Sequence, residues 1–352
     1  NYNVKDFLLQ CLRSIEKAQS NLNVETIVVD NNSSDGSVGF LKQQFPNVIF
    51  HKLDENKGFS FANNLGISFA RGKYILILNP DTILSEDTLS TMHNYMESHT
   101  EVGISGCKLL NPDGSFQLAC RRGFPTPWVS FCKLFGLQKL FPKSKIFAGY
   151  NQTYKSTDET YYVDSIMGAF MFARTEILKE IGGFDTDFFM YGEDIDLCYR
   201  IAKKGWKVAY IHSTSVVHYK GESTKRSPIN EVKYFYESMK IYSKKHNNNS
   251  SIFLFFLKIG IFIRSLFAYL NRFKRQILIL FFDIIAINFS LVLGTKLRFE
   301  EYLGFPDYAY PIVFIVVSLV MIISMFVVGE YFESKQSVRK ALFGYMVSFF
   351  FL

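Results

Sequence analysis

The sequence becomes strongly apolar from about Ile252 onward, and this change in composition constrains the architecture of the chain more than any other feature. Beyond it, residues 277–295 and 311–329 form two nearly uninterrupted apolar runs, and a third run begins near Ala341. Each of the two complete runs is close to the ~20 residues that a helix needs to cross a bilayer. We therefore predict that the chain combines a domain of ordinary composition with membrane helices.

The stretch 252–270 is less uniformly apolar, because basic residues interrupt it and a basic cluster follows it at 272–275. If this stretch crossed the bilayer, the cluster would lie on the far side from the first domain, against the usual preference of basic residues for the cytoplasmic side. We favour a helix in the membrane surface, with a spanning helix as the alternative. The predicted parts are a folded domain over 1–250, an interfacial amphipathic basic helix over 251–276, and truncated transmembrane helices over 277–352.

The formal net charge of +7 raises the question of a nucleic-acid partner. The basic residues form no stripe interleaved with aromatic residues, and they cluster beside apolar segments instead. This placement favours an anionic membrane surface, and no nucleic-acid partner is predicted. The five cysteines include no C-x-x-C pair, so neither a zinc site nor a disulfide framework is predicted.

Strand and helix patterns alternate over the first 110 residues. The runs 24–29 and 74–78 are typical of buried strands, and helical patterns lie between them at 36–44 and 60–70. Alternation of this kind predicts an α/β fold with a mostly parallel sheet. Ligands of such sheets bind beyond the carboxyl ends of the strands, where Asp30 and Asp81 would both lie.

Two polar loops in this region are candidates for nucleotide binding. One runs from Asp30 through Asn32, where a carboxylate could accept the imide N–H of a uracil or thymine ring. The other contains Asn56 and Gly58, and the glycine would allow close approach of the backbone to a ligand. The simpler interpretation is an Asx-rich turn in the first loop and a capped helix after the second.

The sequence Leu78-Asn79-Pro80-Asp81-Thr82 places a carboxylate at the end of a buried strand. Such an oxygen suits Mg²⁺ or Mn²⁺, which commonly share their ligands with substrate phosphates. His218 ends another strand-like run beside a Gly/Ser turn, which suits a second metal ligand or a diphosphate contact. A plain strand-ending turn and a structural histidine are the alternatives.

Three acids, at 193, 194 and 196, begin a predicted helix over 193–204. The helix dipole favours acids there, and Asp196 with Arg200 is most simply an ion pair. Glu193 and Asp194 are the better candidates for a general base that takes the proton of a substrate hydroxyl. Further upstream, Arg121 and Arg122 are candidates for binding an acceptor phosphate, with a solvated basic turn as the alternative.

These motifs form an ordered series over about residues 1–245: D-N-N-S-S-D-G-S, N-K-G-F, L-N-P-D-T, G-G-F-D, G-E-D-x-D-L-C-x-R and H-Y-x-G-x-S. In this order they resemble the inverting family 2 glycosyltransferases, and within them the bacterial rhamnosyltransferase-like and galactofuranosyltransferase-like branch. The resemblance implies a GT-A-like nucleotide-sugar-binding domain of α/β class, followed here by membrane helices. The start at Asn1 is similar to the end of the first strand of that family, so we expect that strand to be missing from this sequence.

The resemblance also implies roles for single residues. Asp30 would contact the base of the donor, Asp81 and His218 would hold a divalent metal (Mg²⁺ or Mn²⁺), and Asp194 would be the general base. The D-x-D triplet of the family has an amide here at its first position, which weakens metal binding from there. The predicted catalytic residues are Asp194 and Glu193, the predicted substrate-binding residues are Asp30, Asn32, Asn56, Gly58, Asn79, Arg121 and Arg122, and the predicted metal ligands are Asp81 and His218.

The implied function is inverting transfer of a sugar, with rhamnose as the candidate, from a nucleoside-diphosphate sugar donor to a hydroxyl of a lipid-linked glycan acceptor. This reaction would serve cell-surface polysaccharide synthesis at the cytoplasmic face of the bacterial inner membrane. The segment 282–299 resembles the amino-terminal membrane segment of polyprenyl-phosphate sugar-phosphate transferases and membrane sugar-nucleotide dehydratases. A fragment of such a transferase and a non-catalytic nucleotide-sugar-binding membrane scaffold are therefore the two alternative functions.

Overall fold

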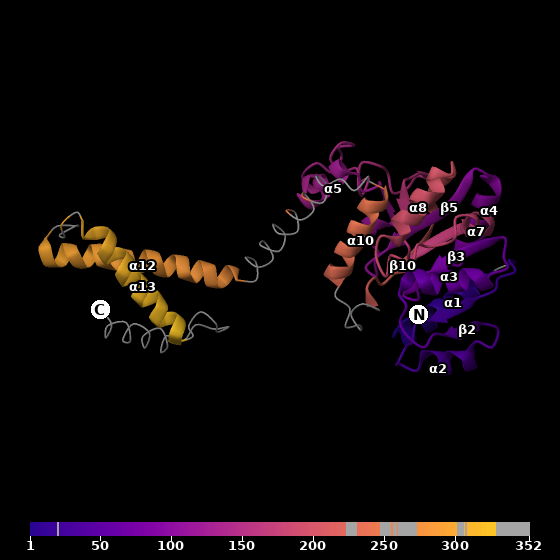
Figure 1. The fold of residues 1–352 in the computed structure, drawn as a ribbon, viewed down its shortest axis with the longest axis horizontal. Helices are drawn as coiled ribbons and strands as arrows, with labels where there is room; N and C mark the ends of the chain where they lie inside the picture. The colour runs from indigo at the N-terminus through magenta and orange to yellow at the C-terminus, as the bar shows by residue number, and fades with distance from the viewer. Residues whose placement is uncertain are drawn as a thin grey trace. The chain divides into compact units, whose positions relative to one another are not determined.

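The computed structural model describes residues 1–19, 21–222, 231–246, 273–300 and 308–328, together with positions 255, 259 and 306. The chain divides into two compact units, Asn1–Gly260 and Ile261–Leu352 (Figure 1). The predicted boundary after residue 250 and the predicted third membrane run from Ala341 lie outside the described residues. The predicted interfacial helix at 252–270 lies almost entirely outside them as well.

Helices and strands alternate in the first unit as far as the strand Val102–Leu110. Its elements in this part are α1 (Lys5–Ala18), β1 (Ile27–Asp30), α2 (Ser37–Gln44), β2 (Ile49–Lys52), α3 (Phe59–Phe69), β3 (Tyr74–Leu78), β4 (Thr82–Leu84), α4 (Thr88–Ser98) and β5 (Val102–Leu110). The predicted helices and strands of this region are present, and β3 has the predicted bounds. The apolar spacing explains α1, because Leu8, Leu12 and Ala18 lie on its buried face.

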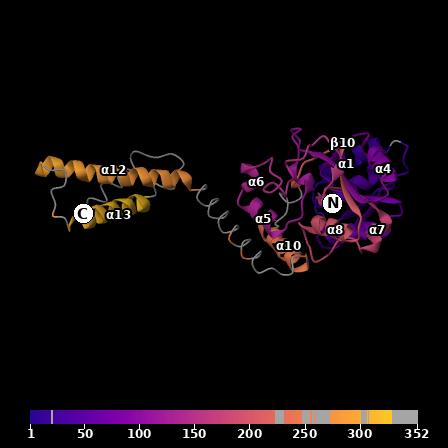
Figure 2. The same ribbon diagram turned by 90° about the horizontal axis from the view of Figure 1, so that it is seen from above.

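The second half of the unit contains shorter elements before its last long strand. These are the 3₁₀ turn η1 (Leu118–Cys120), β6 (Arg121–Arg122), α5 (Pro127–Leu134), α6 (Leu137–Leu140), β7 (Tyr161–Tyr162), β8 (Ser165–Ile166), β9 (Phe170–Arg174), α7 (Thr175–Glu180), α8 (Glu193–Lys203), β10 (Lys207–His218) and α10 (Glu231–His246). The acids in the first turn of α8 and the basic residues in its last turn both suit the helix dipole. In Figures 1 and 2, α10 lies beside α8.

The main sheet is mixed, so the prediction of a mostly parallel sheet is wrong in this respect. Its strand order is β3-β9-β5-β10-β4, with β7 paired to β10. Among the described strands of this sheet, β5 and β10 pair in parallel and the other neighbours pair antiparallel. The difference arises because β9 inserts between β3 and β5 and runs against both. Strands buried on both faces are apolar in either direction, so their sequences do not reveal it.

The core of the first unit lies between this sheet and its covering helices. The fully buried side chains include Met92 and Met96 from α4, Ile104 from β5, Phe170 from β9 and Tyr210 from β10. Each large apolar side chain that is removed from water contributes about 1.5–3 kcal/mol. The sheet is thereby held rigidly enough for the loops at its ends to keep fixed positions.

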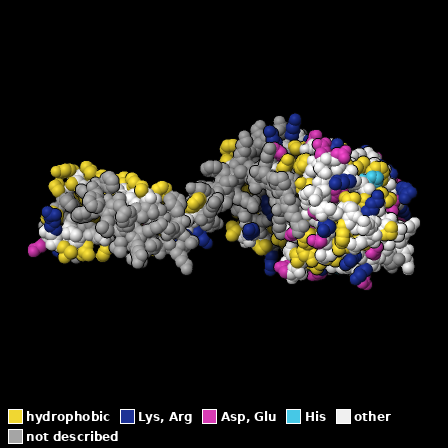
Figure 3. All heavy atoms as spheres, turned by 90° about the horizontal axis from the view of Figure 1, so that it is seen from below, with side chains coloured by type: hydrophobic (Ala, Val, Ile, Leu, Met, Phe, Trp, Pro, Cys, Tyr) yellow, Lys and Arg dark blue, Asp and Glu magenta, His cyan; other side chains and the backbone are white. Residues whose placement is uncertain are grey.

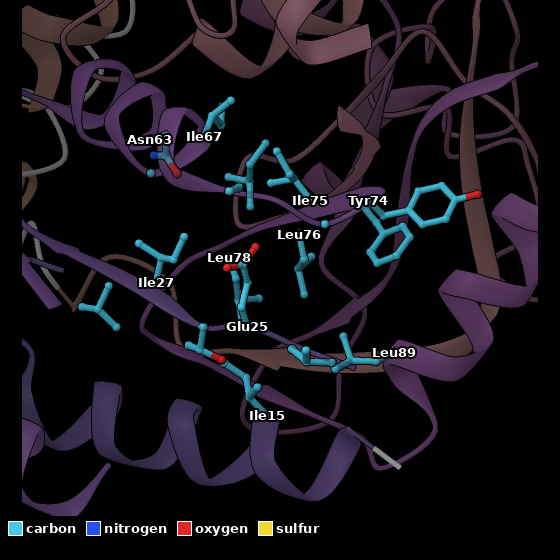
Figure 4. A pocket seen from close by; sticks show the side chains of 18 of the residues that line it. Ile15, Glu25, Ile27, Asn63, Ile67, Tyr74, Ile75, Leu76, Leu78 and Leu89 are labelled. Atoms are coloured by element: carbon cyan, nitrogen blue, oxygen red, sulfur yellow. The ribbon is translucent and has the colours of Figure 1, made fainter. Parts of the chain in front are cut away.

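A second, two-stranded sheet of β1 and β2 is separate from the main sheet among the described strands. A cavity of about 720 Å³ lies where β1 and β3 face each other, and the apolar side chains of both strands line it (Figure 4). Ile27 and Ile75 contribute from the two strands, and Ile67 contributes from α3. The cavity lining includes none of the predicted catalytic residues or metal ligands, so this cavity is not the candidate active site.

The second unit contains α12 (Lys274–Phe299) and α13 (Tyr310–Val328). Both predicted apolar helices are thus present, and each is long and apolar enough to cross a membrane. Many of their large hydrophobic side chains are exposed, and Figure 3 shows such groups along the described surface of this unit. Asn288 donates a hydrogen bond to the Ser318 hydroxyl at 3.2 Å and links the two helices.

Candidate active site

The structure brings the two predicted metal ligands together. Asp81 follows β3, and His218 is the last residue of β10. β10 pairs antiparallel with β4 and places His218 opposite Thr82, which is the chain neighbour of Asp81. The His218 Nε2 atom is 3.4 Å from the Asp81 Oδ1 atom, and the two residues are only 3% and 4% exposed.

Gln117, which the sequence did not single out, fixes the tautomer of His218. Its amide nitrogen donates to the carbonyl oxygens of His218 at 2.6 Å and Leu110 at 3.3 Å, which sets the orientation of the amide. Its amide oxygen therefore accepts a hydrogen bond from the His218 Nδ1 atom at 2.9 Å. In the neutral ring, the lone pair of Nε2 then faces the lone pairs of Asp81 Oδ1.

Two buried lone pairs at this distance repel each other unless a proton or a cation lies between them. A histidine nitrogen and a carboxylate oxygen are ordinary ligands of Mn²⁺, and the orientation of the ring by Gln117 is typical of metal-binding histidines. Within the described residues, no three His, Cys, Asp or Glu side chains are grouped to hold a metal. The residues present thus fit a cation that draws its remaining ligands from a substrate.

Asp194 lies in the first turn of α8, close to the main sheet. Its Oδ2 atom accepts hydrogen bonds from Arg122 at 2.6 Å and from the Gly168 backbone at 2.9 Å. Its Oδ1 atom accepts one from the Ile195 backbone at 2.8 Å. Burial alone would lower the pKa of the Arg122 guanidinium, but the charge and hydrogen bond of Asp194, together with the nearby Tyr150, raise that pKa overall. Arg122 is therefore a permanent cation that orients this carboxylate.

Glu193 differs from its neighbour although both were predicted as catalytic. Burial, and then the charge of Asp194, raise the pKa of Glu193 to about 8. The Glu193 Oε2 atom is buried and has no hydrogen-bond partner among the described residues. Glu193 is therefore mostly a neutral acid at pH 7, and of the two carboxyl groups Asp194 is better suited to accept a proton.

The two halves of the site meet at residues 168 and 169. The backbone N–H of Asn79 donates to the carbonyl of Ala169 at 3.0 Å, and the backbone N–H of the preceding residue, Gly168, donates to Asp194. One backbone bond and one bond to the Asp194 carboxylate thus join the strand end that presents Asp81 to the helix that presents Asp194. The side chain of Asn79 makes no hydrogen bond with any described residue, so it remains available to a ligand.

The two predicted nucleotide loops contact each other through Asn31, which the sequence analysis did not predict as a site residue. Asn31 donates to the carbonyl of Gly58 at 3.0 Å and accepts from the Lys57 backbone at 3.0 Å. Asn56 accepts from the Gly58 backbone at 3.0 Å, as in an Asx turn. Gly58 has a φ of 86°, and a Cβ atom there would lie 2.6 Å from the Phe189 carbonyl oxygen.

Asp30 is fully buried and holds its own loop. It accepts hydrogen bonds from the Asn1 side chain at 2.7 Å, and from the Ser33 hydroxyl at 2.6 Å and backbone at 2.8 Å. These three donors leave about one lone-pair position of the carboxylate for the N–H of a nucleotide base. Asn32 is exposed beside it, in the left-handed region with a φ of 64°.

Arg121 lies away from the carboxylates, unlike the neighbouring Arg122. Its guanidinium is buried and packs against three aromatic rings and the backbone carbonyls of the following loop. The rings belong to Phe116, Tyr161 and Tyr210, and the carbonyls belong to Asn151, Gln152, Lys155 and Ser156. The protein itself thus occupies both terminal nitrogens of the guanidinium, while the buried Nε atom has no hydrogen-bond partner among the described residues.

The helix α10 packs against the segment that precedes α8. The Ser238 hydroxyl donates to the Met190 carbonyl at 2.8 Å, and His246 lies 2.7 Å from Asp196. Asp196 also accepts from Arg200 at 2.7 Å, as the predicted ion pair requires. These bonds fix the segment before α8 and the first turn of α8. The motif residue Ser223 lies outside the described residues.

Comparison with known proteins finds two family matches. The family Glycosyl transferase family 2 matches residues 1–160, and the N-terminal domain of galactosyltransferase matches residues 150–222. The chain is 26% identical over 230 residues to the N-acetylglucosaminyl-diphospho-decaprenol L-rhamnosyltransferase of Mycobacterium tuberculosis (strain ATCC 25618 / H37Rv), covering 62% of this chain and 74% of the relative. It is 33% identical over 173 residues to rhamnosyltransferase WbbL of Escherichia coli (strain K12), covering 46% of this chain and 61% of the relative.

Among solved structures, the chain is similar to the mannosyltransferase PcManGT from Pyrobaculum calidifontis in complex with GDP-Man and Mn²⁺. The sequence identity is 19% and the TM-score is 0.43, with 62% of this chain and 54% of that chain covered.

Proposed function

We propose that this chain, which carries a family 2 glycosyltransferase domain, moves a sugar from a nucleoside-diphosphate donor to a hydroxyl of a lipid-linked glycan, with inversion at the sugar carbon. The family match confirms the resemblance that the motifs predicted, and with it the α/β class of GT-A type. Two of the relatives are named as rhamnosyltransferases, and one name includes a diphospho-decaprenol acceptor. These names support rhamnose as the sugar and a polyprenyl-diphosphate-linked acceptor, in the synthesis of a cell-surface polysaccharide.

One observation carries the proposal, namely the placement of Asp81 with His218 and of Asp194 on adjoining strand and helix ends. A carboxylate has about four lone-pair positions, and three of those on Asp194 accept hydrogen bonds from the protein. The remaining position on Oδ1 would take the proton of the acceptor hydroxyl. The hydroxyl oxygen forms its bond to the sugar carbon as the bond from that carbon to the diphosphate breaks, and the nucleoside diphosphate leaves.

Asp81 and His218 would hold Mg²⁺ or Mn²⁺ together with oxygens of the donor diphosphate. When bound, the cation supplies positive charge where negative charge develops on the departing diphosphate. Asn79 would contribute a neutral ligand or a hydrogen bond to the same diphosphate. Gln117 would keep the Nε2 lone pair of His218 directed at the cation.

We further propose that α12 and α13 cross the bacterial cytoplasmic membrane and hold the catalytic domain at its cytoplasmic face. The length and apolar composition of both helices support this attachment. A lipid-linked acceptor lies in the same membrane, so attachment would confine enzyme and acceptor to one surface.

The substitution Asp194→Asn tests the proposal, because it keeps the shape of the side chain and removes its basicity. We expect kcat to fall by about 10²–10⁴-fold while the donor Kd stays unchanged. Release of nucleoside diphosphate from a panel of labelled donors, in vesicles that contain polyprenyl-linked glycans, measures the rate. Asp6→Asn is the matched control, since Asp6 is an exposed acid of α1. Full activity of the Asp194 variant would refute the assignment, and release of nucleoside monophosphate would indicate phosphosugar transfer instead.

A further inference from the structure

The segment from Phe124 to Gly149, which contains α5 and α6, has an unusual composition. It includes no aspartate or glutamate, and its charged residues are Lys133, Lys139, Lys143 and Lys145. It is also rich in phenylalanine and leucine and contains one of the two tryptophans of the chain. We call this segment the α5–α6 excursion.

Large apolar side chains of the α5–α6 excursion lie on its surface. Leu140 is 70% exposed, Ile146 is 64%, Phe141 is 50% and Trp128 is 49%. The Trp128 indole N–H donates to the Ile146 carbonyl at 3.0 Å, so its polar atom is satisfied within the segment. A tryptophan with a bonded N–H and an exposed ring gains free energy on transfer to an apolar phase without leaving a donor unpaired.

The exposed rings belong to a built cluster rather than to single surface positions. The ring centroids of Trp128 and Phe131 are 5.7 Å apart, and those of Phe141 and Phe147 are 5.0 Å apart. Trp128 and Phe147 lie 6.1 Å apart and connect the two pairs. α5 begins with a capping bond in which the Thr126 hydroxyl accepts from a backbone N–H, so the helix that carries Trp128 is fixed at its start.

The lysines identify the partner that this surface fits. Lys139, Lys143 and Lys145 are exposed, and none of them makes an ion pair with a described residue. Protein interfaces are depleted of lysine at their centres, whereas helices at membrane surfaces combine lysine with Trp, Phe and Leu. The absence of acids removes the repulsion that an anionic surface would otherwise meet. The chemistry therefore fits an anionic phospholipid bilayer.

The neck of the α5–α6 excursion connects it to the active site. The Gly123 backbone donates to the Tyr150 carbonyl at 2.7 Å and closes the loop. The residue before Gly123 is Arg122, which holds Asp194 at 2.6 Å. A bilayer that contacts the excursion would thus lie within one short loop of the carboxylate that receives the acceptor.

We propose that the exposed face of the α5–α6 excursion inserts into the headgroup region of an anionic bilayer and there presents the active site to acceptors embedded in it. This inference rests on the proposed function for the acceptor. Its physical basis is independent of α12 and α13, because it depends on side chains of the first unit alone.

The two tryptophans give a direct test in the full chain, since Trp206 directly precedes β10, at the opposite end of that strand from His218, and packs against the core. Trp206→Phe leaves Trp128 as the single emitter, and Trp128→Phe leaves Trp206 as the matched control. Each variant is placed in phosphatidylglycerol vesicles with brominated acyl chains. We expect Trp128 to shift to shorter wavelength and lose most of its emission, while Trp206 keeps its emission.

Equal emission of Trp128 in brominated and ordinary vesicles would overturn the proposal. Protection of Trp128 from acrylamide without quenching by brominated chains would also overturn it and would indicate a protein partner. Neither helix of the second unit contains tryptophan, so the result does not depend on whether α12 and α13 insert. Extraction of the membranes at alkaline pH tests that insertion separately.

A second measurement separates docking from catalysis. The double substitution Leu140→Ser with Ile146→Ser removes exposed apolar groups that touch no predicted catalytic residue. We expect turnover of a membrane-embedded acceptor to fall several-fold and turnover of a short-chain, water-soluble acceptor analogue to stay unchanged. An equal loss with both acceptors would overturn the docking role. If the unsubstituted chain shows no glycosyl transfer while brominated chains still quench Trp128, the proposed function is refuted and this inference stands.

Discussion

Substitution of Gln117 by methionine tests how the site prepares His218 for a metal. The change keeps the approximate length of the side chain and removes three hydrogen bonds, with His218 Nδ1 at 2.9 Å, the His218 carbonyl at 2.6 Å and the Leu110 carbonyl at 3.3 Å. Without the amide oxygen, the proton of the ring is free to occupy Nε2, which would no longer face Asp81 with a lone pair. Loss of such an orienting partner typically weakens metal affinity by about 10–100-fold.

This loss corresponds to about 1.4–2.7 kcal/mol of metal binding. Two buried carbonyls also lose their donor, so we expect the free energy of unfolding to fall by about 1–3 kcal/mol. The assay is release of nucleoside diphosphate as a function of Mn²⁺ concentration at saturating donor, which gives the half-saturating concentration of the metal.

Substitution of Gln117 by glutamate distinguishes orientation from packing. A carboxylate still accepts the Nδ1 hydrogen of His218 but donates nothing to the two carbonyls. We expect the glutamate variant to be destabilised and yet to keep its half-saturating Mn²⁺ concentration within a few-fold of the original. An unchanged value in the methionine variant, or equal shifts in both variants, would refute the role assigned to Gln117.

Three further predictions concern stability. The pKa of Glu193 is raised to about 8, so its neutral form stabilises the fold at low pH, and this contribution declines by about 1.4 kcal/mol per pH unit from about pH 4.5 to about pH 8. Urea unfolding across this range should show that the free energy of unfolding of Glu193→Gln depends less on pH than that of the unsubstituted chain. The same pH dependence in both proteins would contradict the shift. Gly58→Ala should lower the unfolding free energy by several kcal/mol, because the new Cβ meets the Phe189 carbonyl, whereas the control Gly39→Ala meets nothing within 4 Å. Arg121→Met should lower the free energy of unfolding by about 1–3 kcal/mol for each buried carbonyl that loses its donor, and an unchanged thermal unfolding curve would contradict this structural role.

The periodicity of the sequence predicted where helices and strands lie. It could not predict the direction of a strand, because that depends on which strands pair with it. The strand β3 and the helix α8 were found from apolar spacing and a run of acids. The antiparallel direction of β9 was not predictable, because a strand buried on both faces has the same apolar pattern in either direction. Local patterns fix an element, while its neighbours fix its direction.

The residues of the candidate site likewise differ in whether the sequence could predict them. Asp81, His218 and Asp194 follow recognisable strand or helix ends, so their positions could be predicted. Gln117 lies in an irregular turn between β5 and β6, and nothing in its local sequence marks it as a partner of a residue 101 positions away. Arg121 and Arg122 are consecutive residues of a strand and point to opposite faces, which separates a structural arginine from one at the site.

The gap between β1 and β3 has a consequence for how the first unit opens. No hydrogen-bonded ladder joins the two sheets among the described strands, and an apolar cavity separates them. Cooperative opening spreads through ladders, so we expect amide hydrogens of β1 and β2 to exchange earlier than those of β5 and β9. A donor that contacts both the Asp30 loop and Asp81 would bridge the two sheets itself, and its binding should then slow exchange in β1 more than in the main sheet. Binding of the donor would thus stabilise β1 and β2 more than it stabilises the main sheet.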